Sequence, residues 1–206
     1  MKLIRGVLFV LEGIDGTGKS TQSGLLLEKL EARGFDTVYF KEPSDSRWGR
    51  MIRQKAKFQD SLTPEQELEL FLADRRDNVE KNIRPALEKK KAVVLDRYYF
   101  STIAYQGAKG IDIERIRREN EVFAVKPDLV FILDIDPDSG LKRVDKRGDK
   151  DLLFERKDYL AEVRKIFQSF QGESYIHINT SGPIEEVTAR IENIALTYLD
   201  RLVDYS

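Results

Sequence analysis

The segment Gly13-Ile-Asp-Gly-Thr-Gly-Lys-Ser20 constrains the fold of this chain more than any other. It fits the pattern G-x-x-x-x-G-K-[S/T], follows an apolar run at Val7–Leu11 and opens a segment with helical spacing. Its glycines permit positive φ angles and a close backbone approach, so that successive amide N–H groups can converge on an anion at a helix N-terminus. The segment therefore predicts a phosphate-binding loop (P-loop) between a buried strand and a helix.

Five short runs are rich in β-branched and aromatic residues and are predicted strands: Gly6–Leu11, Thr37–Lys41, Ala92–Asp96, Leu129–Asp134 and Tyr175–Asn179. Three of them are continuously apolar rather than alternating, which is typical of parallel strands covered on both faces. Segments with helical spacing lie between the strands. The pattern predicts an α/β fold with a three-layer, doubly wound, five-stranded parallel sheet.

The clearest helix signals flank two of these strands. Gly34 is suited to end a helix that begins at Lys19, and Thr63-Pro-Glu-Gln66 forms a capping box for a helical pattern that continues to Lys90. Pro85 lies inside that pattern, so we expect a kink or a break near it. Further helices are expected at Asp112–Phe123, Asp138–Lys146, Phe154–Phe170 and Pro183–Leu202.

Length and composition exclude several classes of protein. The 206 residues suit one globular domain, which we expect to span residues 1–206. Lys and Arg number 35 against 36 Asp and Glu, so there is no basic field to attract nucleic acid. There is no cysteine, which excludes disulfides and cysteine-ligated zinc. No run is suited to a signal peptide or a membrane span, so we expect a cytoplasmic protein without a membrane partner.

The side chains of the P-loop point to a magnesium-bound nucleoside triphosphate. Lys19 is expected to reach the β and γ phosphates of ATP, and the Ser20 hydroxyl to ligate Mg²⁺. Asp96 ends a central strand, where ligands of open α/β sheets bind, and can hold Mg²⁺ or its waters. Arg97 beside it can grip an acceptor phosphate bidentately. The residues expected to bind ATP are Gly13, Ile14, Asp15, Gly16, Thr17, Gly18, Lys19, Ser20 and Thr21.

Two further charged features suggest a kinase. A carboxylate at Asp15 would be repelled electrostatically by a neighbouring triphosphate. Its presence is explained if it binds a sugar hydroxyl or the water shell of the reacting phosphate. The dense charge run between Lys142 and Lys157 can be a solvated helix end. Because phosphoryl transfer needs cations around the γ-phosphate and exclusion of water, we favour a lid at about residues 143–155, with Arg143 and Arg147 facing the phosphates.

Four segments resemble the thymidylate kinase family: Phe9–Gln22, Glu42-Pro43, Leu70–Arg75 and Asp96–Gly107. The resemblance covers nearly the whole chain. It implies a P-loop nucleoside monophosphate kinase fold with a five-stranded parallel core and a lid. It also implies transfer of a phosphoryl group from ATP, with Mg²⁺, to dTMP in dTTP biosynthesis, and a homodimer.

Carried over by position, the resemblance implies that Phe71 stacks on thymine, that Arg75 hydrogen-bonds its O4, and that Thr102 and Gln106 flank the base edge. Phe71 and Arg75 are four residues apart, so on a helix they share one face. The resemblance further places Asp15 at the sugar 3′-hydroxyl. Tyr105 would crowd the 2′ position and favour deoxyribose.

The resemblance assigns the acceptor phosphate to Arg97 and Arg53. The segment Glu42–Trp48 departs from the Glu-Pro-Gly-Gly and Phe-Pro-Glu-Arg patterns of the family, so Arg47 and Arg50 compete with Arg53 for this role.

Gly16 stands where some members of the family carry an arginine, which resembles the branch that supplies its catalytic arginine from the lid. Arg147 is the first candidate for that arginine and Arg143 the second. Residues 180–182 follow the last predicted strand, where this fold cradles adenine.

Two alternatives stay open. The chain can be a P-loop kinase for another nucleoside monophosphate or a deoxynucleoside, or a nucleotide-dependent regulatory switch. The pairs Asp96-Arg97 and Phe71/Arg75 argue against the switch.

Overall fold

A computed structural model describes residues 1–58, 62–144 and 151–204 of the chain. Its centre is a sheet of parallel strands in the order β2-β3-β1-β4-β5. The strands are β1 (Val7–Glu12), β2 (Thr37–Lys41), β3 (Ala92–Asp96), β4 (Leu129–Asp134) and β5 (Tyr175–Asn179). Four of them have the predicted bounds and β1 is displaced by one residue. The prediction of a five-stranded parallel sheet is confirmed.

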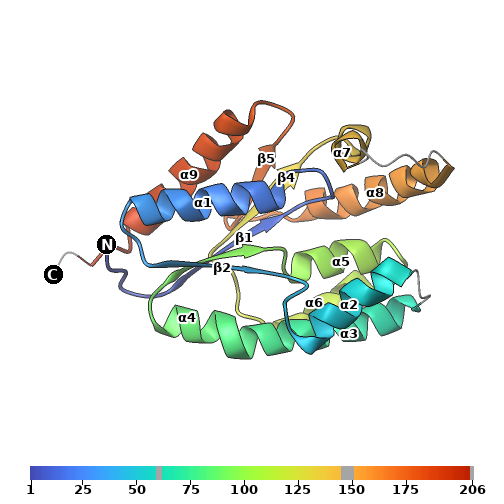
Figure 1. The fold of residues 1–206 in the computed structure, drawn as a ribbon, viewed down its shortest axis with the longest axis horizontal. Helices are drawn as coiled ribbons and strands as arrows, with labels where there is room; N and C mark the ends of the chain where they lie inside the picture. The colour runs from blue at the N-terminus through green and yellow to red at the C-terminus, as the bar shows by residue number, and fades with distance from the viewer. Residues whose placement is uncertain (59–61, 145–150, 205–206) are drawn as a thin grey trace.

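Helices cover both faces of this sheet (Figure 1). On one face lie α1 (Lys19–Ala32) and α9 (Ile184–Asp200), packed over Phe9 and Phe131. The other face is covered by α3 (Pro64–Asn78), the π-helical turn η1 (Val79–Ile83), α4 (Arg84–Glu88), α5 (Tyr99–Gly107), α6 (Ile113–Glu121) and α8 (Asp151–Ser169). Two further helices, α2 (Arg47–Phe58) and α7 (Pro137–Val144), pack on α3 and α8.

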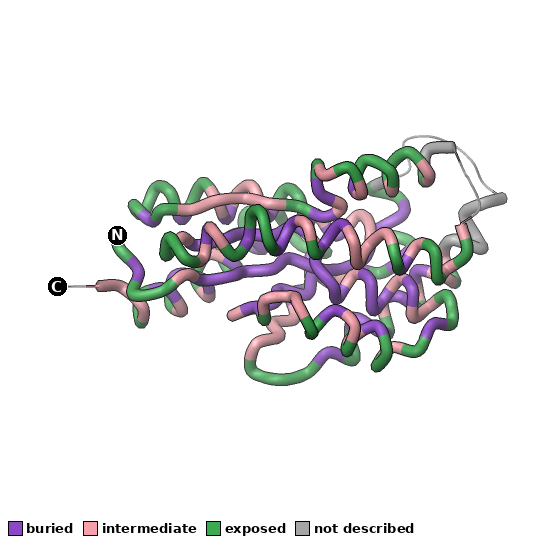
Figure 2. Tube along the Cα trace, turned by 90° about the horizontal axis from the view of Figure 1, so that it is seen from below, coloured by how far each residue is buried: buried purple, intermediate pink, exposed green. Residues whose placement is uncertain are grey.

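The central strands are fully buried, as their continuous apolar sequences predict. Every residue from Val7 to Leu11 and from Ala92 to Leu95 has no exposed surface. Figure 2 shows these strands as a buried trace through the middle of the molecule. Because both faces of β1 and β3 are covered, functional side chains can reach solvent only at the strand ends.

The helix ends that carry strong local signals form as predicted. Thr63 and Gln66 make both hydrogen bonds of the capping box, with N···O distances of 3.2 and 3.0 Å. Gly34 has φ 83° and donates its N–H to Glu31 after the end of α1. The irregularity expected near Pro85 is η1, at whose end the Arg84 N–H donates to the carbonyl of Val79, five residues earlier.

The sequence did not predict α2 and α5. Helix α5 begins among aromatic and β-branched residues, and its N-cap residue Tyr98 makes no side-chain cap. Its cap comes instead from Glu12 at the end of β1, whose Oε1 accepts the N–H groups of Tyr98 (2.7 Å) and Ser101 (3.1 Å). Because the capping carboxylate is 86 residues away from the start of α5, the sequence around α5 carries no signal for this helix start.

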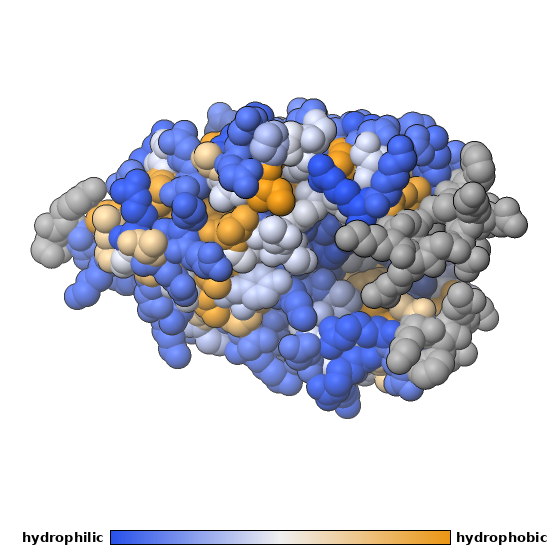
Figure 3. Space-filling view, turned by 45° about the horizontal axis from the view of Figure 1, so that its top comes forward, coloured by the Kyte–Doolittle hydropathy of each residue, from blue (hydrophilic) through white to orange (hydrophobic). Residues whose placement is uncertain are grey.

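No helix in the described part of the chain combines the length and apolar character needed to cross a bilayer. The face in Figure 3 is mostly hydrophilic, with small scattered hydrophobic patches.

Candidate active site

Two cavities meet at the carboxyl ends of β1 and β3. The P-loop cavity has a volume of about 720 Å³, and its lining includes Asp15 to Gln22, Arg143 and Thr180. The α3–α5 cavity has a volume of about 410 Å³, and its lining includes Phe71 and Arg75. Asp15 and Arg97 line both cavities, so a ligand in one can contact a ligand in the other at these two side chains.

Lys19 lies buried in the P-loop, where its Nζ donates to the Ile14 carbonyl at 2.8 Å. Burial, together with the positive charge of Arg97, lowers the pKa of Lys19 to about 7. Of the predicted ATP-binding residues, Asp15 to Thr21 line the P-loop cavity, whereas Gly13 and Ile14 belong to the same loop but are not part of the cavity lining. Nearby phosphate charge would favour the protonated amine, so this position suits a phosphate-binding lysine.

Ser20, which lines the P-loop cavity, contacts Asp96 at the end of β3, and Asp96 itself is in neither cavity lining. The Ser20 hydroxyl donates to Asp96 Oδ2 at 2.5 Å, and the Tyr39 hydroxyl donates to the same oxygen at 3.3 Å. Asp96 Oδ1 is buried and has no hydrogen-bond partner among the described residues. A buried carboxylate oxygen without a donor, beside a hydroxyl, fits a hard divalent cation such as Mg²⁺.

Arg97 stands at the boundary of the two cavities. Its backbone has φ 68°, a conformation that non-glycine residues rarely adopt, and it directs the guanidinium to Asp15 Oδ1 at 2.5 Å and to Ser101 Oγ at 3.0 Å. Ser101 in turn donates to Glu12 Oε2 at 2.5 Å. The buried Glu12 therefore fixes both the start of α5 and a side chain that holds Arg97.

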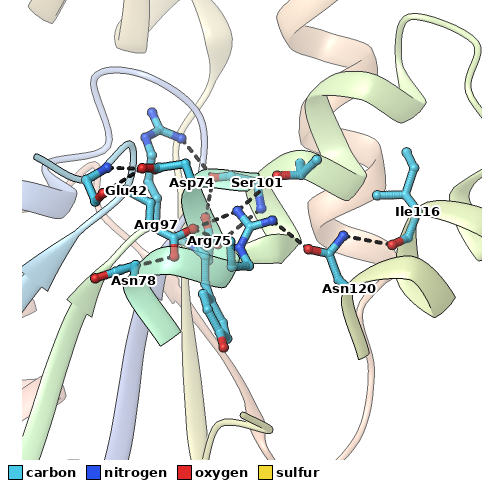
Figure 4. A network of polar contacts seen from close by, with 12 residues as sticks. Glu42, Asp74, Arg75, Asn78, Arg97, Ser101, Ile116 and Asn120 are labelled. Atoms are coloured by element: carbon cyan, nitrogen blue, oxygen red, sulfur yellow. Dashed lines mark hydrogen bonds and ion pairs between the residues drawn. The ribbon is translucent and has the colours of Figure 1, made fainter. Parts of the chain in front are cut away.

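Arg75 is the centre of a buried polar network (Figure 4). Its Nε and Nη2 lie 2.8 and 2.7 Å from Glu42 Oε2, and its Nη1 donates to Asn120 Oδ1 at 2.6 Å. Nη2 also donates to the Thr102 hydroxyl at 3.1 Å. Burial raises the pKa of Glu42 to about 7, against the opposing effect of the Arg75 charge. The network fixes the guanidinium plane at the wall of the α3–α5 cavity.

The other residues that the resemblance assigns to the base and sugar also line the α3–α5 cavity: Phe71, Thr102, Tyr105 and Gln106. Phe71 is partly exposed and belongs to neither core cluster, which argues against a role in core packing. As predicted from their spacing, Phe71 and Arg75 share the face of α3 that meets this cavity.

Three arginines predicted as candidates for the acceptor phosphate line neither cavity in the described structure. Arg53 donates to the Pro43 carbonyl at 2.8 Å and to Asp45 at 3.1 Å, and Arg50 donates to the Asp45 carbonyl at 2.5 Å. Arg47 lies over the Trp48 ring. Arg50 and Arg53 contact the segment between β2 and α2, and Arg47 contacts its neighbour within α2. Arg97 is therefore the predicted phosphate ligand that the structure brings to the cavities.

The two arginines predicted to lie in a lid differ in what the structure describes. Within the predicted lid, residues 143–155, the structure does not describe residues 145–150, which include Arg147. It does not describe the side chains of residues 144 and 151–155 either. Arg143 lines the P-loop cavity, where it donates to the carbonyls of Thr180 (2.9 Å) and Gly16 (3.4 Å). Gly16 has φ 84°, and a Cβ there would lie 2.2 Å from the Gly140 carbonyl oxygen. The P-loop has no room for an arginine at position 16.

Three residues that shape the site were not predicted from the sequence. Glu12 and Glu42 brace Arg97 and Arg75, and their position at or just after the ends of strands was a signal for both. Tyr159 comes from α8 and lines the α3–α5 cavity, with its hydroxyl donating to the Tyr105 carbonyl at 2.8 Å. No local pattern marks Tyr159, because its place depends on the packing of α8 against α5.

Comparison with known proteins agrees with this geometry. A family model described as thymidylate kinase matches residues 11–191. A probable thymidylate kinase of Archaeoglobus fulgidus is 45% identical over 94% of this chain and 97% of its own. Thymidylate kinases of Akkermansia muciniphila and Brachyspira hyodysenteriae are 46% and 44% identical over 91% and 92% of this chain, and 90% and 93% of their own. The chain belongs to the thymidylate kinase family.

Proposed function

We propose that this chain phosphorylates dTMP to dTDP with ATP and Mg²⁺, binding ATP in the P-loop cavity and dTMP in the α3–α5 cavity. The observation that carries the proposal is the shared wall of the two cavities at Asp15 and Arg97. Phosphoryl transfer depends on positioning and charge neutralisation more than on covalent chemistry. Arg97 at this boundary can hold the acceptor phosphate close to the γ-phosphate.

Each cavity offers the groups that its ligand needs. In the P-loop cavity, Lys19 and the loop amides would bind the phosphates, and residues 180–182 would lie beside adenine. In the α3–α5 cavity, Phe71 would stack on thymine and Arg75, held by Glu42, would donate to its O4. Asp15 would accept from the 3′-hydroxyl of the sugar, and Tyr105 would crowd its 2′ position.

Ser20 and Asp96 would hold the magnesium ion, because their oxygens lie together and Asp96 Oδ1 has no other partner in the described structure. The ion would neutralise charge on the β and γ phosphates.

We further propose one domain over residues 1–206 with a lid at about residues 143–155, acting as a cytoplasmic homodimer in dTTP biosynthesis. The family resemblance supports the lid and the dimer, and light scattering on the purified protein tests the dimer.

Replacing the lid arginines one at a time tests the proposed source of the catalytic arginine. Arg147→Ala is expected to lower kcat by about 10²- to 10³-fold with little change in the KM for ATP, as for loss of a group that contacts the transferring phosphoryl. Arg143→Ala is expected mainly to raise the KM for ATP, because Arg143 lies against the P-loop and Thr180. Steady-state kinetics at varied ATP check both. A larger loss of kcat at Arg143 would assign the catalytic role to Arg143.

A further inference from the structure

Gln106 in the α3–α5 cavity has one satisfied and one unsatisfied end. Its side-chain Nε2 donates to Glu67 Oε2 at 2.9 Å. Its Oε1 is buried and has no hydrogen-bond partner in the described part of the chain. Gln106 is 2% exposed, so solvent cannot easily satisfy this oxygen. A buried acceptor in a cavity wall, without a donor, is suited to a donor on the ligand.

Glu67 determines which end of the Gln106 amide lacks a hydrogen-bond partner. An ionised carboxylate only accepts hydrogen bonds, so the amide must turn its NH₂ group toward Glu67. Lys109 also donates to Glu67 Oε2 and forms an ion pair with it, which holds the carboxylate in place. Glu67, Gln106 and Lys109 all line the α3–α5 cavity.

We propose that Glu67 is a positioning residue for base selection: it orients the Gln106 amide so that Oε1 accepts from the N3–H of a thymine or uracil ring. Cytosine carries a lone pair at N3 and would face this oxygen with a second acceptor. The inference rests on the proposed binding of dTMP in this cavity. The proposed hydrogen bond involves N3–H and not the 5-methyl group. It therefore favours dTMP and dUMP over dCMP but does not discriminate between dTMP and dUMP.

The test compares three variants on dTMP, dUMP and dCMP. Glu67→Met removes the acceptor, frees the Gln106 amide to turn, and is expected to lower the ratio of kcat/KM for dTMP to that for dCMP by about 10- to 100-fold. The dTMP to dUMP ratio is expected to stay within about twofold, since both bases carry N3–H. Glu67→Gln keeps one acceptor oxygen and is expected to fall between Glu67→Met and the wild type.

Glu65→Gln is the matched control, because Glu65 lies in the same turn of α3, pairs with Arg115 and does not line the cavity. It is expected to keep both wild-type ratios. Equal losses on all three acceptors in Glu67→Met, or an unshifted dTMP to dCMP ratio in a folded variant, would overturn the inference. Melting curves of each variant show that it is folded. A wild-type protein that preferred dCMP would instead overturn the proposed function.

Discussion

Lys19→Met is expected to lower kcat by about 10³-fold or more while leaving the affinity for dTMP nearly unchanged. The Lys19 side chain lies buried in the P-loop cavity and does not line the α3–α5 cavity. Methionine keeps the length of the side chain but removes the charge that would neutralise the β and γ phosphates. Single-turnover kinetics measure the loss of transfer, and calorimetric titration with dTMP measures the retained binding.

Lys29→Met is the matched control for this variant. Lys29 lies near the other end of α1, is half exposed and lies 3.9 Å from Glu192, far from both cavity linings. Its replacement is expected to leave kcat unchanged, because exposed ion pairs contribute little. Turnover near the wild-type value in Lys19→Met would contradict the assignment of the P-loop as the phosphoryl-donor site.

Arg75→Met is expected to lower the free energy of unfolding by about 3 to 5 kcal/mol, the range for breaking a buried ion pair by removing one partner. It leaves Glu42 without its strongest donor and Asn120 Oδ1 without the Arg75 donor. Affinity for dTMP is expected to fall by about 10- to 100-fold, since a charged donor to the base is lost. Denaturant unfolding and dTMP titration check the two effects separately.

The double variant Arg75→Met/Glu42→Gln separates structure from recognition. Removing the Glu42 charge as well relieves the unpaired buried carboxylate, so much of the lost stability is expected to return. Affinity for dTMP is not expected to return, because the guanidinium is still absent. If the double variant bound dTMP as the wild type does, Arg75 would be a structural residue and not a ligand of the base.

The sheet and the P-loop could be predicted because their signals are local. Buried parallel strands have continuous apolar sequences, and the loop motif binds phosphate through its own backbone. Phe71 and Arg75 could be paired because helical spacing alone puts them on one face. Arg97 could be assigned because it follows directly the end of a central strand.

Features that depend on distant contacts could not be predicted. Helix α5 takes its cap from Glu12, and the orientation of Arg75 depends on Glu42 and Asn120, all far away in the sequence. The position of Arg53 in the sequence suggested a phosphate ligand. In the structure its guanidinium instead donates to the backbone carbonyl of Pro43, just after β2. Sequence position can indicate that a side chain is long enough to reach a site. It does not indicate which of several nearby acceptors the side chain will bind.

Transfer of the phosphoryl group from ATP to dTMP is tested by the initial rates of ADP formation with dTMP, dUMP, dCMP, dGMP and thymidine as acceptors. With ATP and Mg²⁺ held constant, we expect the highest kcat/KM for dTMP, with dTDP formed in equal amount to ADP. A higher kcat/KM for dUMP, dCMP, dGMP or thymidine, or ATP hydrolysis that does not respond to any acceptor, would contradict this assignment.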